Sequence, residues 1–346
     1  MTARQGTTMK IALVPDKQAV RLIDAPVPRP PAGCVRVRVR ACGICGSDLH
    51  IFRGHWRNGK LGHEVCGVVD QVADDVTDLA PGTRVCAECF GHCGQCVFCR
   101  SGRYNHCPSI SWYGWQEHGA MAEYTCFPAR SVFAVPDALS DAEAVMVEPL
   151  AVAFHAVRRA HLEPGSAVGI VGAGTIGLLC AATARTQGAG RVVVVARHAH
   201  QAEAARRLGA DDVALIGRDN PAEVLGPDRM VDAAIDTVAA GTSFSTALAA
   251  VRSCGRMVLV GGVTRPIMAA LAPLVDREIE LTGSQCYAVT DGKPDFQWAI
   301  ELIASGRVDA GGLVTHTFPL ADVEEAFHTA ADKTTGATKV VVQMAD

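Results

Sequence analysis

Residues 166–196 carry the pattern that most restricts how this chain can fold. An apolar run, "SAVGIVGAG" (166–174), leads directly into the helix-like "TIGLLCAATARTQGA" (175–189), and "RVVVVA" (191–196) follows. This order predicts a βαβ unit within a parallel sheet. The turn is "GAGTIG", in which glycines permit a tight bend and a close approach of backbone to a pyrophosphate at the helix N-terminus. We therefore predict a dinucleotide site, with a purely structural glycine turn as the alternative. The predicted site comprises Gly172, Gly174, Thr175, Ile176 and Gly177.

The same alternation continues along the chain. A helix is predicted at 201–210, and strands are predicted at 231–238 and 255–262. Beyond residue 288, two helical patterns at 293–308 and 320–333 precede a last strand at 338–344. Strands that alternate with helices predict an α/β protein with a doubly wound parallel sheet.

The first 150 residues have a different pattern. Short runs that alternate apolar and polar residues, such as 34–42 and 66–73, are separated by Gly and Pro. This period of two predicts strands. A length of 346 residues is suitable for about two domains. We therefore expect a β-rich domain to precede the parallel sheet.

An irregular cysteine lobe lies within this β-rich region, at about 86–107. The chain has fourteen cysteines and begins with no apolar export signal, so reduced thiols and metal are expected rather than disulfides. Four thiolates suit a closed, tetrahedral structural zinc. An iron–sulfur cluster and a nucleic-acid-binding zinc ribbon are the alternatives, and the nearby Cys89 and His92 are possible further ligands. The predicted ligands are Cys93, Cys96, Cys99 and Cys107.

The net charge of −4, with acidic and basic residues interspersed, gives no reason to expect a nucleic-acid partner. No run reaches the roughly 18 apolar residues that suggest a membrane span. We expect a cytoplasmic protein without a membrane or nucleic-acid partner.

Motifs on both sides of the cysteine lobe give a more specific indication. Cys45, Ser47 and His50 follow one another in "CGSDLH", "GHE" follows at 62–64, and "EPLA" begins at Glu148. In this order, ahead of the glycine turn, they resemble the zinc-dependent medium-chain dehydrogenase/reductase family, over essentially the whole chain. Gly46 and Glu148 look like its polyol, sorbitol and threonine dehydrogenase branch, and aminocyclitol dehydrogenases share similar motifs.

The resemblance implies a domain plan. A GroES-like catalytic domain would occupy residues 1–150 and include the structural zinc lobe at about 86–107. A Rossmann dinucleotide-binding domain would occupy 151–288, and residues 289–346 would return to the catalytic domain. Oligomers are also implied, so we expect a homodimer or homotetramer.

The resemblance also implies a catalytic zinc with an open position for substrate. Cys45 and His63 would be ligands, and Glu64 and Glu148 would share the third position, directly or through water. Two zinc ions per chain are therefore expected.

The resemblance further suggests a route for the proton that leaves the alcohol. Ser47 and His50 would relay it to solvent through the cofactor ribose. Asp48 would orient the zinc-ligating histidine through a hydrogen bond. A surface location without a catalytic role is the alternative for His50.

The identity of the nicotinamide cofactor depends on the end of the second strand. NAD-preferring sites usually have an acid there, about 20 residues beyond the glycines, which holds the ribose 2′-hydroxyl. Here Ala196 is followed by Arg197 and His198, and no acid occurs before Glu203. A guanidinium pairs well with a 2′-phosphate, so NADP(H) is expected to be preferred, with NAD(H) possible. The alternative is a surface arginine and no discrimination.

Further site residues are predicted from their place in the family pattern. Gly261 and Lys339 complete the expected cofactor contacts. Aromatic and polar loop residues are candidates for the substrate pocket, although such residues often only pack. They are Trp56, Trp112, Tyr113, Trp115 and His118.

Together these features predict a zinc-dependent NAD(P)-linked oxidoreductase that interconverts a secondary alcohol, of polyol, sugar-alcohol or cyclitol type, and its ketone. One alternative is a zinc-independent quinone or enone reductase of the same fold. The other is a non-catalytic, zinc-stabilised nucleotide-binding protein.

Overall fold

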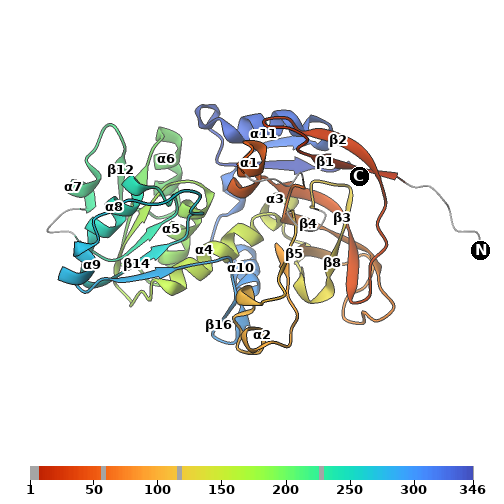
Figure 1. Ribbon diagram of the computed structural model, residues 1–346, viewed down its shortest axis with the longest axis horizontal. Coiled ribbons are helices and arrows are strands. Elements are labelled where there is room, and N and C mark those ends of the chain that lie inside the picture. Colours follow the sequence, from red (N-terminus) through yellow and green to blue (C-terminus); the bar gives the residue numbers. More distant parts are fainter. Residues whose placement is uncertain (1–7, 56–59, 115–118, 226–229, 346) are drawn as a thin grey trace, which may run out of the picture. The chain divides into compact units, whose positions relative to one another are not determined.

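The computed structural model describes residues 8–55, 60–114, 119–225 and 230–345 (Figure 1). The chain divides into two compact units, one formed by 1–148 with 314–346 and the other by 149–313. The first boundary lies close to the predicted one at 150. The return to the first unit begins at Val314, whereas the sequence analysis places it at 289.

The second unit is built on a parallel sheet. Within the described residues six strands pair in the order β12-β11-β10-β13-β14-β15, all of them parallel. In this order the direction of winding reverses between β10 and β13, which is where doubly wound sheets bind their ligands. The strands are β10 (Ala167–Val171), β11 (Arg191–Ala196), β12 (Asp212–Leu215), β13 (Val231–Asp236), β14 (Val251–Leu259) and β15 (Glu280–Gly283).

Helices cover this sheet (Figure 1). They are α4 (Val147–Arg159), whose first two residues belong to the first unit, α5 (Thr175–Thr186), α6 (Ala199–Arg207), α7 (Pro221–Leu225), α8 (Gly241–Ala250), α9 (Ala272–Asp276) and α10 (Asp295–Ala304). The β-hairpin of β16 (Val289–Thr290) and β17 (Lys293–Pro294) precedes α10. An apolar cluster that includes Val193, Ala234, Leu248 and Met257 fills the space between β-sheet and helices.

Two contacts hold residues 289–313 in the second unit. The buried Asp295 accepts a hydrogen bond from the Ala288 N–H (2.8 Å) and lies 2.8 Å from Nδ1 of His155 on α4. The rings of Tyr287 and Phe296 meet edge to face. The family pattern alone does not reveal these contacts, which explains why the return to the first unit begins later than predicted.

The first unit contains a mostly antiparallel sheet that the C-terminal segment completes. Its strand order is β18-β19-β3-β4-β5-β9, and β8 also pairs with β3. The strands are β3 (Cys34–Gly43), β4 (Glu64–Val72), β5 (Arg84–Ala87), β8 (Tyr124–Pro128), β9 (Val132–Ala134), β18 (Val314–Pro319) and β19 (Lys339–Gln343). The pairing of Val341 with Gly43 brings the end of the chain to the end of β3.

Smaller elements surround this sheet. The described strands include two further pairs, β1 (Thr8–Leu13) with β2 (Arg21–Pro26) and β6 (Phe90–Gly91) with β7 (Ser111–Trp112). The α-helices are α1 (Gly46–Phe52), α2 (Val97–Arg100), α3 (Asp141–Ala144) and α11 (Val323–Ala331). The 3₁₀ turns of the two units are η1 (Tyr104–His106), η2 (Ala129–Ser131), η4 (Gly311–Leu313), η5 (Leu320–Asp322) and η6 (Lys333–Thr335). A single apolar core joins Val37, Phe52, Phe127 and Phe327.

Among the described residues, no helix combines the length and the apolar character that crossing a bilayer requires.

Candidate active site and metal centres

The glycine turn lies where the sequence places it, between β10 and α5. Gly172 has a φ of +103°, and a Cβ there would stand 2.5 Å from Oγ1 of Thr237 at the end of β13. A Cβ on Gly177 would collide with the carbonyl of Gly172. A Cβ on Gly174, by contrast, would have no described atom within 4 Å. Two glycines are therefore required by packing, and the third leaves open space at the N-terminus of α5, as a bound pyrophosphate needs.

The end of β11 presents a cation rather than an acid. Ala196 is buried, whereas Arg197 is exposed, and Oε1 of Gln201 accepts hydrogen bonds from the N–H groups of Arg197 (3.3 Å) and His198 (3.2 Å). Within the described part of the chain the Arg197 guanidinium has no hydrogen-bond or ion-pair partner. It is therefore available to a ligand.

Two further residues of this unit are fixed by packing. The His198 ring stacks on that of His200, with ring centroids 5.5 Å apart. A Cβ on Gly261 would stand 2.7 Å from the carbonyl carbon of Val238, so glycine at this position allows β14 and β13 to end close together. Both contacts are compatible with the predicted cofactor roles but do not test them.

In the first unit, Asp48 ties together the two loops that carry Cys45 and His63. Its Oδ2 accepts a hydrogen bond from the Cys45 N–H (3.0 Å), and its Oδ1 accepts one from the Gly62 N–H (3.0 Å). Oδ1 lies 3.9 Å from Nδ1 of His63, close enough for electrostatic attraction but too far for a hydrogen bond. Burial alone would lower the pKa of His63. The negative charges of Asp48 and Cys45 outweigh burial, and so does a hydrogen bond with Cys45, so the pKa of His63 lies well above its usual value.

Glu64 forms a buried ion pair with the C-terminal strand. Lys339 Nζ donates to Oε1 (2.7 Å) and Oε2 (2.5 Å) of Glu64 and to the Ile44 carbonyl (3.1 Å). Both side chains are almost completely buried. Burial opposes the charge on Lys339, but Glu64 outweighs it and raises the pKa of the ammonium group. Lys339, predicted as a cofactor contact, thus has its donors directed at Glu64, a contact that the sequence did not indicate.

Glu148, at the start of α4, approaches the same cluster from another direction. It is 5% exposed, and burial raises its pKa to about 7 against the opposing attraction of His63. The thiol of Cys89, which is also buried, hydrogen-bonds to it. Cys89, whose position in the sequence made it a possible ligand of the cysteine lobe, thus lies beside Glu148 instead.

The buried hydroxyl of Ser47 indicates a ligand site in this unit. Its Oγ atom is inaccessible to solvent and has no hydrogen-bond partner among the described residues. Buried hydroxyls are nearly always hydrogen-bonded in folded proteins. A substrate or ribose hydroxyl beside it would supply the missing partner, so the residues present fit the groups that the sequence predicts.

The four cysteines of the lobe form a compact sulfur cage. Their Sγ atoms all lie within 4.8 Å of one another, with 3.8 Å between Cys93 and Cys99 and 3.5 Å between Cys96 and Cys99. A tetrahedral zinc with 2.3 Å bonds spaces its sulfurs about 3.8 Å apart. The ligands of a multi-iron cluster surround several ions and stand farther apart, so the cage fits one ion.

Backbone groups favour a thiolate at one cysteine of this cage, Cys93. N–H groups of Gln95 and Cys96 donate to Cys93 and lower its pKa to about 6. His92 Nδ1 lies 3.6 Å from the Cys99 sulfur, and its ring stacks on Tyr104, whose hydroxyl donates to the buried Glu88 (2.6 Å).

The donors of the predicted catalytic centre are less tightly gathered. Among the described residues, three or more possible metal-binding atoms come within 4.8 Å of one another only in the sulfur cage. Cys45, His63 and Glu148 interact but do not reach this spacing. Binding a metal there therefore requires their side chains to close around it.

The predicted pocket residues have mixed outcomes. Tyr113 is 6% exposed and packs on Phe127, with ring centroids 4.7 Å apart, while Trp112 meets Phe90 edge to face. Packing accounts for both aromatic residues, and substrate contact stays a prediction. Trp56, Trp115 and His118 lie outside the described residues.

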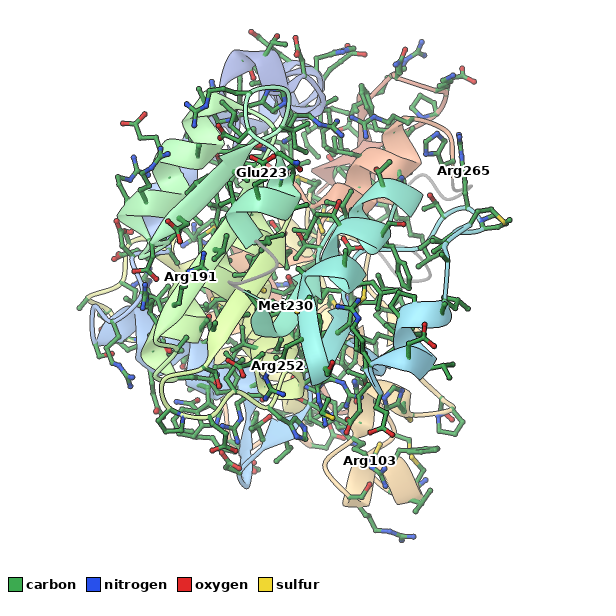
Figure 2. All side chains as sticks on the ribbon, turned by 90° about the vertical axis from the view of Figure 1, so that its left-hand side faces the viewer. Arg103, Arg191, Glu223, Met230, Arg252 and Arg265 are labelled. Carbon is green, nitrogen blue, oxygen red and sulfur yellow. The ribbon has the colours of Figure 1, made fainter. Side chains whose placement is uncertain are left out.

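A hollow on the second unit is unrelated to the predicted site. It has a volume of about 430 Å³ and is lined by α7 and α8, with Leu225 and Thr246 among its residues. Met230, between the labelled Glu223 and Arg252 in Figure 2, also lines it. No predicted site residue contributes to it, so we assign it no function.

The buried ion pair gives a prediction about stability. Lys339→Met leaves the Glu64 carboxylate buried without its counter-ion and should lower the free energy of unfolding by about 3–5 kcal/mol. The double variant Glu64→Gln with Lys339→Met should recover most of this loss. The change would be measured from urea unfolding midpoints at constant m value.

Lys10→Met is the matched control. Lys10 pairs with Asp24 at the surface, where the side chains are 50% and 60% exposed, so its loss should cost less than about 1 kcal/mol. Equal effects of Lys339→Met and Lys10→Met would contradict the importance of the buried pair.

Comparison with known proteins agrees with this arrangement. Residues 31–137 match the alcohol dehydrogenase GroES-like domain, and 175–305 match the zinc-binding dehydrogenase domain. The chain is 34% identical to sorbitol dehydrogenase of Bacillus subtilis, over 99% of both chains.

Two solved structures are also similar. A protein of Escherichia coli CFT073, described as a short chain alcohol dehydrogenase and solved with NADH, has a TM-score of 0.90 and 28% identity. A zinc-binding dehydrogenase of Sinorhizobium meliloti 1021, bound to NADP, has a TM-score of 0.89 and 27% identity. Each comparison covers 98% of this chain and 100% of the other. The predictions of fold class and family are confirmed, and the chain belongs to the zinc-binding, medium-chain dehydrogenase/reductase family.

Proposed function

We propose that this protein is a zinc-dependent, NAD(P)-linked dehydrogenase that interconverts a secondary alcohol of polyol, sugar-alcohol or cyclitol type and its ketone. The observation that carries the proposal is the cluster of Cys45, His63 and Glu148 in the first unit, with a buried Ser47 hydroxyl that lacks a partner among the described residues. The sorbitol dehydrogenase relative supports the substrate class.

Each residue of the cluster has a distinct role in the proposal. Cys45, His63 and Glu148 hold a catalytic zinc, which when bound acidifies the substrate hydroxyl while the nicotinamide accepts hydride. Ser47 Oγ hydrogen-bonds to the hydroxyl that loses its proton. His50 carries that proton away. Asp48 keeps the two ligand loops together through its two backbone hydrogen bonds.

The buried ion pair favours Glu148 over Glu64 as the third ligand in the resting enzyme. Both Glu64 oxygens already accept hydrogen bonds from Lys339. Coordination by Glu64 would break these bonds and leave a buried ammonium without its partner, which is costly. Glu148, by contrast, hydrogen-bonds to the Cys89 thiol, a weaker partner to exchange.

The cage of Cys93, Cys96, Cys99 and Cys107 holds a second, structural zinc in this proposal. It offers four sulfur donors at the spacing of one tetrahedral ion and therefore leaves no position for substrate.

Metal analysis tests the two assignments. The wild type should contain two zinc ions per chain. Cys45→Ala should lose one zinc and all turnover while keeping its fold, whereas Cys99→Ala should lower the melting temperature because a structural zinc contributes to folding. Cys254→Ala, which removes an exposed thiol, is the control. It should leave the zinc content, the turnover and the melting temperature unchanged. Near-normal turnover in Cys45→Ala would contradict the catalytic assignment.

A substrate panel tests the reaction itself. Polyols, cyclitols, their ketones, quinones and enones would be screened by the absorbance of the reduced cofactor. Oxidation of a secondary alcohol that is lost on zinc removal supports the proposal. Turnover of enones or quinones that survives zinc removal would support the zinc-independent reductase instead. Cofactor binding without turnover of any compound would favour a non-catalytic protein.

We also propose that NADP(H) is preferred. Arg197 is exposed and lacks a partner among the described residues, and no acid follows Ala196 where one would repel a 2′-phosphate. One similar structure contains NADP and the other NADH, so both cofactors are used within this fold.

Steady-state kinetics with both cofactors tests this preference. Arg197→Ala should lower kcat/KM for NADP(H) at least about tenfold, or 1.4 kcal/mol, with little change for NAD(H). Ala196→Asp should shift the preference toward NAD(H). Arg206→Ala, on the helix α6 that follows Arg197, removes an exposed arginine as the matched control. A wild type that favours NAD(H) about tenfold would overturn the proposal.

A homodimer or homotetramer in the cytoplasm completes the proposal. Strand β15 lies at the edge of the parallel sheet with Leu281 43% exposed, and Leu271 and Val275 near α9 are 54% and 78% exposed. An uncovered apolar sheet edge is a favourable site for pairing with a second copy. The fourteen cysteines all lie within the described residues and none forms a disulfide, which agrees with a reducing compartment.

A further inference from the structure

The end of α1 brings two histidines together. The Gly54 N–H donates to the Ile51 carbonyl (2.8 Å), and the His55 N–H donates to the His50 carbonyl (2.9 Å). Gly54 has a φ of +74°. These are the two hydrogen bonds and the left-handed residue of a Schellman motif, in which the side chains at its two ends are brought into contact.

In Schellman motifs this contact is frequently apolar, but here both side chains are imidazoles. Nδ1 of His50 lies 3.2 Å from Nδ1 of His55, and the ring centroids are 5.5 Å apart. His50 is half-buried, whereas His55 is exposed. The pair therefore leads from a sheltered position to solvent.

We propose that His55 is the outer member of a two-histidine proton relay, which takes from His50 the proton released by the alcohol and delivers it to water. This inference rests on the proposed dehydrogenase function. It adds a residue that the motifs around Cys45 did not include.

The proton balance of the relay is simple. His50 accepts a proton at Nε2 and releases one from Nδ1 to Nδ1 of His55, so that His50 is neutral again. His55, now an imidazolium, releases a proton from Nε2 to water or buffer. One proton enters and one leaves, and no electrons move. In ketone reduction the same steps run in reverse.

The surroundings of His50 favour transfer over storage of the proton. Burial lowers its pKa, and the neighbouring His55 and Arg53 lower it further. His50 is therefore mostly neutral at pH 7 and does not retain the proton as a stable cation. Because Nδ1 of His55 lies 3.2 Å from Nδ1 of His50, His50 can transfer the proton directly to His55.

A metal site is a weaker explanation for the pair. Two nitrogens 3.2 Å apart suit one shared proton. Among the described residues no third donor joins them to form a group within 4.8 Å.

The first test measures the coupling without relying on activity. In wild type and His55→Phe, the titration of His50 would be followed by NMR of its imidazole carbons. His55→Phe keeps a ring on the Schellman motif but removes an imidazole that lowers the pKa of His50, so that pKa should rise. His316→Phe, which alters a half-buried histidine on β18, is the control and should leave the titration unchanged. An unchanged titration of His50 in His55→Phe would overturn the pairing.

The second test measures proton transfer in the zinc-loaded enzyme. With the substrate identified by the panel, His55→Phe should lower kcat about tenfold at pH 6–7 with little change in KM, and the deficit should shrink at high pH, where hydroxide replaces the relay. Added imidazole should restore the rate. In His50→Gln the further change His55→Phe should have little effect, because both residues act in one pathway.

The outcomes separate the two proposals. A wild type that is inactive on every alcohol would overturn the dehydrogenase function, and with it the relay, while the NMR titration still decides whether the histidines are paired. An active wild type in which His55→Phe has a normal kcat at all pH values would overturn the relay alone. A rate loss equal at every pH and insensitive to imidazole would also overturn it, since that behaviour indicates a packing role.

Discussion

The ion pair between Glu64 and Lys339 joins the beginning of β4 to the beginning of β19, and the candidate site depends on it. The carboxylate lies directly beside His63 in the sequence and shares its electrostatic environment with Glu148. Without the ammonium group, two buried carboxylates would repel one another there. With it, the cluster holds nearly balanced charge, and a glutamate with a pKa of about 7 remains near His63. The same contact secures the C-terminal strand to the first unit.

Backbone hydrogen bonds prepare both candidate metal centres. Asp48 accepts N–H groups from the loops of Cys45 and His63 and so sets their separation. In the cysteine lobe, N–H groups directed at the sulfurs favour thiolate over thiol at Cys93. The two candidate centres differ in the spacing of their donor atoms. The four sulfurs already have the spacing that one ion requires, whereas Cys45, His63 and Glu148 would have to move closer together to bind one. This difference agrees with the proposal, in which the cage holds a structural ion and the other centre an ion that must keep room for substrate.

The sequence predicted those parts of the molecule whose signal is local. The glycine turn, the strands at 191–196 and 231–236 and the last strand are long buried runs with clear boundaries, and they lie where they were expected. Strand β14 begins at Val251 rather than at 255, because the polar residues of "VRSC" hide its beginning. Helices α7 and α8 and strands β12 and β15 were not predicted, since each is short or bordered by polar residues. The partner of Glu64 could not be found at all, because Lys339 is 275 positions away. The contact between His50 and His55 could have been predicted. A glycine directly after a helix indicates a Schellman motif, which brings His55 back to His50.

The C-terminal strand makes the first unit discontinuous in the chain, and this has a consequence for synthesis. Residues 149–313 can fold as soon as they leave the ribosome, because all strands of their sheet are then present. The first unit emerges earlier but lacks β18 and β19 at that stage, and Glu64 remains without its counter-ion until Lys339 has been translated. The ion pair beside the candidate site is therefore completed only after β19 has been translated, so a product truncated before Lys339 would lack it.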